Sequence, residues 1–206
     1  MQSSDLIPAF SDPVEGSQNV FRVLLKALSE PGQIHDLTPS NQTHQIHQLE
    51  ELSQAGYALA LTLLDSSTTV WLSPHFSHPK IRQNLAFHCG CQFVDQPEAA
   101  MFAFLTANES EVLTRLQVGT DRDPELSCTA IVQLDQLTPF STGAQSIWTG
   151  PGIKDHRHVA LDINKDFWTI REQKNQFPRG IDVFFIAQNS VLGLARSTHV
   201  QPVVEA

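Results

Sequence analysis

The side chains whose types and spacing could support chemistry lie near the C-terminus, on either side of a short apolar run. Asp182 stands at the start of the apolar stretch 181–186, directly after a turn that contains proline and glycine. A carboxylate at the mouth of a buried strand needs partners, and Arg196 and His199 follow the next apolar run. The three residues predict either a ligand site or a structural ion-pair cluster, because buried charge pairs often serve only the fold.

A second candidate is the stretch 149–153, which reads Thr-Gly-Pro-Gly-Ile. Two glycines around a proline let backbone N–H groups approach a ligand closely, which suits phosphate oxygens. The stretch lacks the spacing of a P-loop or of a dinucleotide-binding turn, and its proline removes one donor. Lys154, His156 and Arg157 follow directly. The pattern is therefore typical of a tight structural turn or of an anion-binding loop, and both interpretations stay open.

Metal-site and nucleophile hypotheses have weaker support. Residues 88–91, His-Cys-Gly-Cys, do not have the usual spacing of zinc ligands, and they end a predicted helix, where the helix dipole disfavours a thiolate. A triad of Ser197, His199 and Asp182 lacks the nucleophile elbow that such a serine needs. We therefore predict no metal site and no catalytic nucleophile, and we interpret two histidine pairs as solvated: His75 with His78, and His156 with His158.

Composition narrows the function classes further. The chain has 206 residues, 41% hydrophobic and 17% charged, which is typical of a globular protein, and we predict a single α/β domain over residues 1–206. A net charge of -9 and the lack of any basic run argue against partners such as nucleic acid or an anionic membrane. A phosphate-bearing substrate would have to recruit its cations from five lysines and eight arginines.

The apolar stretches, the first residues and the cysteines of the sequence indicate the cellular compartment of the protein. No apolar stretch is long enough for a membrane helix, and the first residues do not have the pattern of a secretory signal. The cysteines are Cys89, Cys91 and Cys128, an odd number with no disulfide-framework spacing. We therefore expect a cytoplasmic protein.

The predicted elements alternate between helices and strands. The pattern predicts helices over residues 13–28, 49–64, 77–90, 109–116 and 164–173, and strands over residues 68–72, 100–105, 129–134 and 181–186. Residues 1–11 are predicted to form an arm or a surface strand, and residues 40–48 and 138–143 are predicted to form loops. The class that this order favours is α/β, with a mixed sheet flanked by helices. In the first helix Arg22 and Lys26 share a face, where they are either solvated or opposed by an anion or an acid.

Several motifs, taken together and in order, resemble the PhnH family of the carbon–phosphorus lyase complex. They span nearly the whole chain and comprise residues 21–32 (Phe-Arg, then Ala-Leu-Ser-Glu-Pro-Gly after four residues), 62–65 with 70–72, 149–153, 177–182 and 196–200. The resemblance implies a fold like the large domain of pyridoxal-phosphate-dependent transferases, without that cofactor. We therefore expect no cofactor.

The same resemblance implies partners and a reaction. It implies a homodimer when the chain is isolated, and membership of a carbon–phosphorus lyase core complex that also contains the G, I and J subunits. Together with the G, I and L subunits, the family is required to move the ribose triphosphate of ATP onto methylphosphonate. Adenine is released, and the product is α-D-ribose 1-methylphosphonate 5-triphosphate.

The family positions define the candidate site. The match supports Gly180 and Thr198 as family positions, together with most of the site residues, but implies no catalytic role for any of them. We expect Asp182 to brace Arg196 or His199. The predicted substrate-binding residues, which would line a cleft for a phosphate-bearing group, are Thr149, Gly150, Gly152, Asp182, Arg196 and His199. Two other hypotheses remain: an adaptor with no ligand site, and an independent hydrolase using His199 and Asp182.

Overall fold

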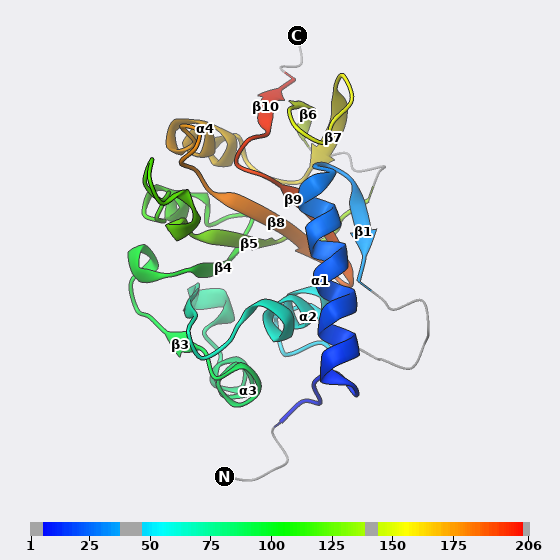
Figure 1. Ribbon diagram of the computed structural model, residues 1–206, viewed down its shortest axis with the longest axis vertical. Coiled ribbons are helices and arrows are strands. Elements are labelled where there is room, and N and C mark those ends of the chain that lie inside the picture. The colour runs from blue at the N-terminus through cyan, green and yellow to red at the C-terminus, as the bar shows by residue number, and fades with distance from the viewer. Residues whose placement is uncertain (1–5, 38–46, 139–143, 204–206) are drawn as a thin grey trace.

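A mixed β-sheet forms the centre of the molecule. The computed structural model describes residues 6–37, 47–138 and 144–203. Within these ranges the central sheet has seven strands in the order β1-β9-β8-β5-β4-β2-β3 (Figure 1). Strands β2, β3, β4, β5 and β8 are parallel, and β9 and β1 are antiparallel to their neighbours. The bounds are β1 Ile34–Asp36, β2 Thr69–Leu72, β3 Gln92–Phe93, β4 Phe102–Thr106, β5 Thr129–Gln133, β8 Asp182–Ala187 and β9 Ser190–Leu194.

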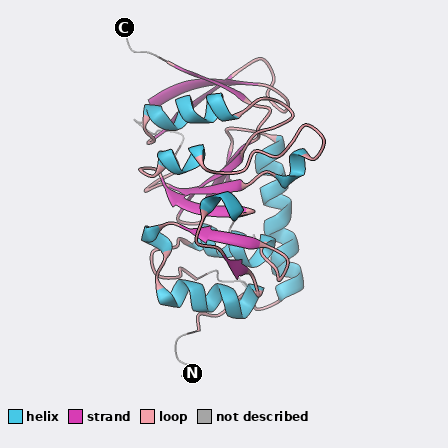
Figure 2. Cartoon of the chain, turned by 90° about the vertical axis from the view of Figure 1, so that its left-hand side faces the viewer, coloured by secondary structure: helices cyan, strands magenta, loops and turns pink. Residues whose placement is uncertain are grey.

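Helices cover both faces of this sheet. Helices α1 (Pro13–Ser29), α2 (Gln54–Leu63) and α3 (Pro79–Cys89) share one hydrophobic cluster with one face. Helix α4 (Lys165–Lys174) and the 3₁₀ helix η4 (Ser110–Thr114) share a second cluster with the other face. Figure 2 shows this layering edge-on. Three further 3₁₀ helices are η2 Pro74–Phe76, η3 Pro97–Ala99 and η5 Pro124–Leu126. The predicted α/β class, with a mixed sheet flanked by helices, is confirmed.

Helix α1 begins and ends where the sequence predicts. The side chain of Asp12 accepts hydrogen bonds from two backbone N–H groups of the first turn, and Pro13 occupies the first helical position. The helix lies directly on β9, because Gly193 has no side chain: a Cβ there would stand 2.4 Å from the carbonyl oxygen of Ala27. A glycine is therefore required for this close approach of helix to strand.

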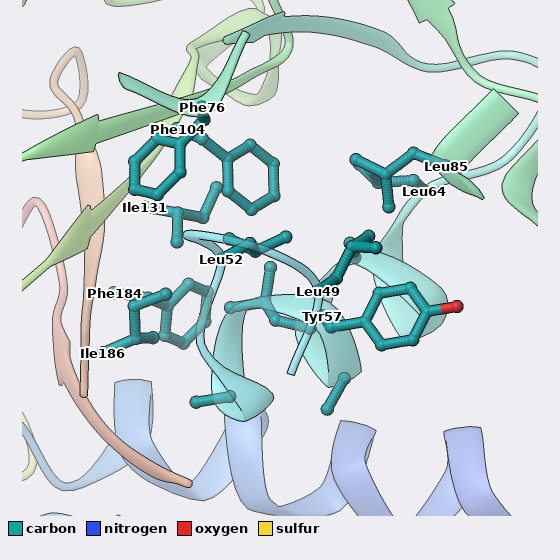
Figure 3. Close-up of a cluster of buried hydrophobic side chains, with 14 of the residues drawn as sticks. Leu49, Leu52, Tyr57, Leu64, Phe76, Leu85, Phe104, Ile131, Phe184 and Ile186 are labelled. Atoms are coloured by element: carbon teal, nitrogen blue, oxygen red, sulfur yellow. The ribbon is translucent and has the colours of Figure 1, made fainter. Parts of the chain in front are cut away.

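The first hydrophobic cluster joins α2 to the sheet. Figure 3 shows Leu52, Phe104, Ile131 and Phe184 converging, with Tyr57 at the side of the cluster. The hydroxyl of Tyr57 points away from the apolar side chains and donates to the backbone carbonyl of residue 7 at 3.2 Å. This contact joins the N-terminal arm to the core.

A second, three-stranded sheet has the order β10-β6-β7 and lies at the end of the molecule opposite α3 (Figure 1). Its strands are β6 Ala144–Thr149, β7 Arg157–Leu161 and β10 His199–Pro202. Trp148 is fully buried between this sheet and α4, and its Nε1 donates to Ser146 Oγ at 2.8 Å. The sequence pattern predicted neither β7 nor this separate sheet.

Two predicted helices are wrong in extent or type. The helix expected over 49–64 begins at residue 54, because Leu49 and Leu52 form a tight turn with two mutual backbone hydrogen bonds, and Ser53 then caps the helix. The helix expected over 109–116 is the short 3₁₀ helix η4. Residues 1–5, 40–46 and 139–143 of the predicted arm and loops lie outside the described residues. No helix among the described residues has the length and apolarity to cross a membrane.

Candidate functional site

Asp182 and Arg196 form a half-buried ion pair at the amino edge of the central sheet. Asp182 is the first residue of β8, and Arg196 follows the antiparallel strand β9. The Arg196 Nε and Nη2 donate to Asp182 Oδ2 at 3.0 and 2.5 Å, and the Arg196 backbone N–H donates to Oδ1 at 2.6 Å. Their side chains are 18% and 20% exposed. Asp182 therefore binds Arg196, one of the two partners that the sequence suggested.

The remaining donor of the Arg196 guanidinium also faces the protein. Its Nη1 donates to the backbone carbonyl of Pro124, in the η5 segment that precedes β5. The same segment is linked to the turn before β8, because Gly180 N–H donates to the carbonyl of Val118 at 2.9 Å. Arg196 thus links the turn after β9 to β8 and to the segment before β5. The guanidinium of Arg196 therefore makes its hydrogen bonds to groups within the protein.

Arg171 is a third member of this network, and it was not among the predicted site residues. It lies on the inner face of α4 and is 2% exposed. Its Nη1 and Nη2 donate to the backbone carbonyls of Thr198 and Ala195 at 3.2 and 2.8 Å. Burial lowers the pKa of Arg171 to about 10, although the negative charges of Glu172 and Asp182 act to raise it. Arg171 therefore fixes the turn that carries Arg196 and leads into β10.

The sequence feature that could have identified Arg171 as buried is its position in the predicted helix over residues 164–173. Arg171 is four positions after Phe167, so the two residues share one face of a helix. Phe167 is fully buried, so an arginine on that face requires internal acceptors.

The stretch 149–153 connects β6 to two other elements. A Cβ on Gly150 would lie 3.0 Å from the carbonyl oxygen of Ser197, in the turn held by Arg171. Gly152 has a φ of +81°, and a Cβ there would lie 1.9 Å from the carbonyl oxygen of Ser29, at the end of α1. The glycines are therefore explained by contact with backbone. Of the following cations, Arg157 donates to the carbonyls of Glu30 and Pro31.

Thr149 and His199 are the two predicted site residues with exposed polar side chains. They face each other across strands β6 and β10, where they form the first pair of the register. Gly150 follows Thr149 and contacts the turn at Ser197, two residues before His199. The structure thus brings Thr149, Gly150 and His199 together at the surface, next to the Asp182–Arg196 pair. Gly152 lies instead against the end of α1.

The histidine and cysteine candidates serve other contacts. His88 Nε2 lies 3.0 Å from the carbonyl of residue 7, and His156 and His158 pack edge to face at 5.2 Å. Burial raises the pKa of the Cys89 thiol to about 12, which disfavours a nucleophilic thiolate. Among the described residues, no group of three or more His, Cys, Asp or Glu could hold a metal ion.

A crevice of about 300 Å³ opens at the opposite, carboxyl edge of the sheet. The chain leaves β2 towards β3 and leaves β4 towards β5, so the connections after these two neighbouring strands run in opposite directions. The crevice lies at this point, which is the usual place of a ligand in an open α/β sheet. Its polar lining includes His75, Asn108, Asp135 and Asp162. Two carboxylates and no lysine or arginine make this crevice unsuited to a phosphate. None of the six predicted site residues lines it.

Comparison with known proteins decides the family. The family described as "Bacterial phosphonate metabolism protein (PhnH)" matches residues 8–201. The chain belongs to the PhnH family. It is 34% identical over 205 residues to α-D-ribose 1-methylphosphonate 5-triphosphate synthase subunit PhnH of Rhizobium meliloti, covering 97% of this chain and 98% of that protein. It is also 26% identical over 187 residues to HtxG of Stutzerimonas stutzeri, provisionally named a C–P lyase subunit, covering 89% and 85%.

The structure brings several of the PhnH-like motifs to a common location. The end of α1, the turn 149–153, the turn before β8 and the turn after β9 all meet around Arg171, Arg196 and Gly152. These segments are far apart in the sequence, yet each one contacts the next. These motifs therefore build one junction between α1, the small sheet and the central sheet, whereas the motif at 62–65 and 70–72 lies outside it, at the end of α2 and in β2.

Proposed function

We propose that this chain is a subunit of an α-D-ribose 1-methylphosphonate 5-triphosphate synthase within a carbon–phosphorus lyase complex. The reaction moves the ribose triphosphate of ATP onto methylphosphonate and releases adenine. The observation that carries the proposal is the 34% identity to the synthase subunit PhnH over nearly the full length of both chains. The description of the matching family also names phosphonate metabolism.

The partners that we propose are the other subunits of that complex. Both relatives are named as subunits, one of a synthase and one of a C–P lyase. We propose the G, I and J subunits as the core partners and the G, I and L subunits as the partners in the transfer step, with a homodimer in their absence. The free cysteines Cys89, Cys91 and Cys128 are compatible with a reducing cytoplasm.

The proposed fold relationship is to the large domain of pyridoxal-phosphate-dependent transferases, without the cofactor, and one domain is proposed for the whole chain. The mixed seven-stranded sheet between helical layers supports the first part. Strands of the small sheet share a hydrophobic cluster with the central sheet, which supports the second. The five lysines are exposed or half-buried, whereas a Schiff-base lysine requires a desolvated pocket.

The six predicted site residues remain a proposed ligand surface, with divided roles. We assign contact with a phosphate-bearing group to the exposed side chains of Thr149 and His199. Asp182 and Arg196 hold the turn beneath them through three hydrogen bonds. Gly150 and Gly152 hold the backbone against Ser197 and Ser29.

The second candidate is an adaptor without a ligand site of its own. The specific observation in its favour is Arg196, whose guanidinium donates to Asp182 and Pro124 instead of facing solvent. Titration calorimetry of the isolated chain with ATP and methylphosphonate separates the two functions. Binding heat that disappears in Thr149→Val with His199→Ala supports the ligand surface, and no heat under any condition supports the adaptor.

The test of the main proposal is complementation and co-purification. A strain that lacks its own PhnH subunit should regain growth on methylphosphonate as sole phosphorus source when this chain is supplied. A tagged copy should then recover the other subunits in fixed proportion. Gln201→Ala, also on an exposed position of β10, is the matched control for His199→Ala and should grow normally. Failure of both growth and co-purification would refute the proposal.

A further inference from the structure

Helix α1 carries an apolar stripe that the described part of the chain leaves exposed. Val14, Phe21 and Leu25 are 66%, 45% and 52% exposed. At 3.6 residues per turn they fall within about 40° of one another, so they form one stripe along the helix. The buried residues of α1, such as Val20 and Leu24, occupy a different face that contacts α2 and β9. Solvation alone does not explain three large apolar side chains in one line, and such patches mark interaction sites.

Two cations lie along one side of this stripe. Arg22 and Lys26 follow Phe21 and Leu25 directly, and both are exposed. Arg22 donates to Asn19 Oδ1 at 3.0 Å. Among the described residues, no carboxylate forms an ion pair with either cation, whereas Lys80, Arg115 and other basic residues do find one. Like charges at this spacing repel, so an opposing acid would relieve the repulsion.

The charge pattern indicates what covers this face. The chain has a net charge of -9, yet this part of its surface is apolar and basic. A second copy docked through the same face would bring another Arg22 and Lys26 in place of the acids that these cations need. An anionic membrane would gain only about 1 kcal/mol for each of the two cations, against the repulsion of the rest of the chain. A protein surface with an apolar ridge and adjacent carboxylates satisfies both the stripe and the cations.

We propose that the outer face of α1, formed by Val14, Phe21, Arg22, Leu25 and Lys26, is the docking surface for a partner subunit with an acidic, apolar contact region. The inference rests on the proposed function, which requires a multi-subunit complex. It also accounts for two residues of the first PhnH motif, Phe21 and Arg22, that the core leaves exposed. Central aromatic residues and arginines carry most of the binding energy at such interfaces.

The test is reconstitution of the complex from the full chain and the other carbon–phosphorus lyase subunits of the same host. Phe21→Ser with Leu25→Ser should weaken the affinity of the chain for the remaining complex by about 100-fold or more. Arg22→Glu with Lys26→Glu should weaken it by roughly 10- to 100-fold, and added salt should weaken the wild type more than this variant. The matched control is Leu126→Ser, 65% exposed on η5, with a change of about twofold or less.

The outcomes separate the two proposals. If the wild type assembles and the α1 variants assemble equally well, or if Leu126→Ser fails as strongly, the docking surface is refuted while the function stands. If the wild type recovers no partner, the proposed function itself fails. Sedimentation of the isolated variants, and of wild type with anionic vesicles, tests the other occupants. A homodimer lost in Phe21→Ser, or binding to vesicles, would also overturn the assignment. Unchanged melting temperatures verify that each variant is folded.

Discussion

Removing the Asp182 carboxylate distinguishes a structural brace from a reacting acid. Asp182→Ala deletes three hydrogen bonds from Arg196, with lengths of 2.5, 2.6 and 3.0 Å. Hydrogen bonds to a charged acceptor contribute about 1.5–3 kcal/mol each. The total is smaller than the sum of three such bonds, because the bonds are not additive and the Arg196 and Asp182 side chains are 18% and 20% exposed to solvent. We therefore expect a loss of about 3 kcal/mol in the free energy of unfolding.

The measurement is the melting temperature, followed by circular dichroism or calorimetry. For a chain of this size, about 3 kcal/mol corresponds to a decrease of roughly 6–12 °C. Asp121→Ala is the matched control, because Asp121 also pairs with an arginine, Arg179 at 3.1 Å, but its side chain is 79% exposed. An exposed pair contributes about 1 kcal/mol or less, so the control should melt within about 2–4 °C of the wild type.

The result that would refute the brace is equally specific. If Asp182→Ala melts together with Asp121→Ala but fails to support growth on methylphosphonate, then Asp182 acts on a ligand or a partner. If Asp182→Ala melts early and Asp182→Asn recovers part of the loss, the brace is supported. The asparagine retains an oxygen that can accept the Arg196 backbone N–H.

Three other experiments test the contacts of Arg171, the backbone contact of Gly152 and the burial of Cys128. Arg171→Met removes two hydrogen bonds. The buried Thr198 carbonyl loses a donor, whereas the Ala195 carbonyl still accepts from the Thr198 backbone N–H, so the free energy of unfolding should fall by about 2–3 kcal/mol in urea titration. Gly152→Ala should destabilise by more than about 2 kcal/mol, because its Cβ would meet the Ser29 carbonyl at 1.9 Å, whereas Gly90→Ala, with φ +71° and no atom closer than 3.8 Å, should cost only about 1 kcal/mol. Burial raises the pKa of the Cys128 thiol to about 12, so Ellman's reagent at mildly alkaline pH should label it only after unfolding.

Local signals predicted most of the fold. Asp12-Pro13 and Gly90 mark the start of α1 and the end of α3, because caps depend on adjacent residues. The apolar run before Ala187 predicted β8, because a strand buried on both faces is continuously apolar. These predictions needed no knowledge of distant contacts.

The small sheet escaped prediction because its signals are not local. Strand β7 mixes exposed and buried residues in a short segment that begins just after one histidine and contains another, and this pattern is typical of a loop. It becomes a strand through pairing with β6, and β6 also pairs with β10, some fifty residues further along the chain. Pairing of this kind is set by tertiary context more than by propensity.

The candidate site was predictable only in part for the same reason. The charges of Asp182 and Arg196 and the apolar strand between them predicted either a ligand site or an ion pair, and the structure contains the ion pair. The other acceptor of Arg196, the Pro124 carbonyl, is a backbone group, and backbone groups have no sequence signature. Arg171 had the helical spacing of a buried residue, but its charge suggested solvent.

The location of the junction favours a role through partners. In open α/β sheets ligands bind outside the carboxyl ends of the strands, whereas Asp182 starts β8 and so lies at the amino edge. The carboxyl-edge crevice contains Asp135 and Asp162, which repel a triphosphate. Among the described residues, the lining of the carboxyl-edge crevice also has no cation for a triphosphate. We infer that cations of another subunit strengthen the binding of a triphosphate at Thr149 and His199, and this inference links the proposed ligand surface to assembly.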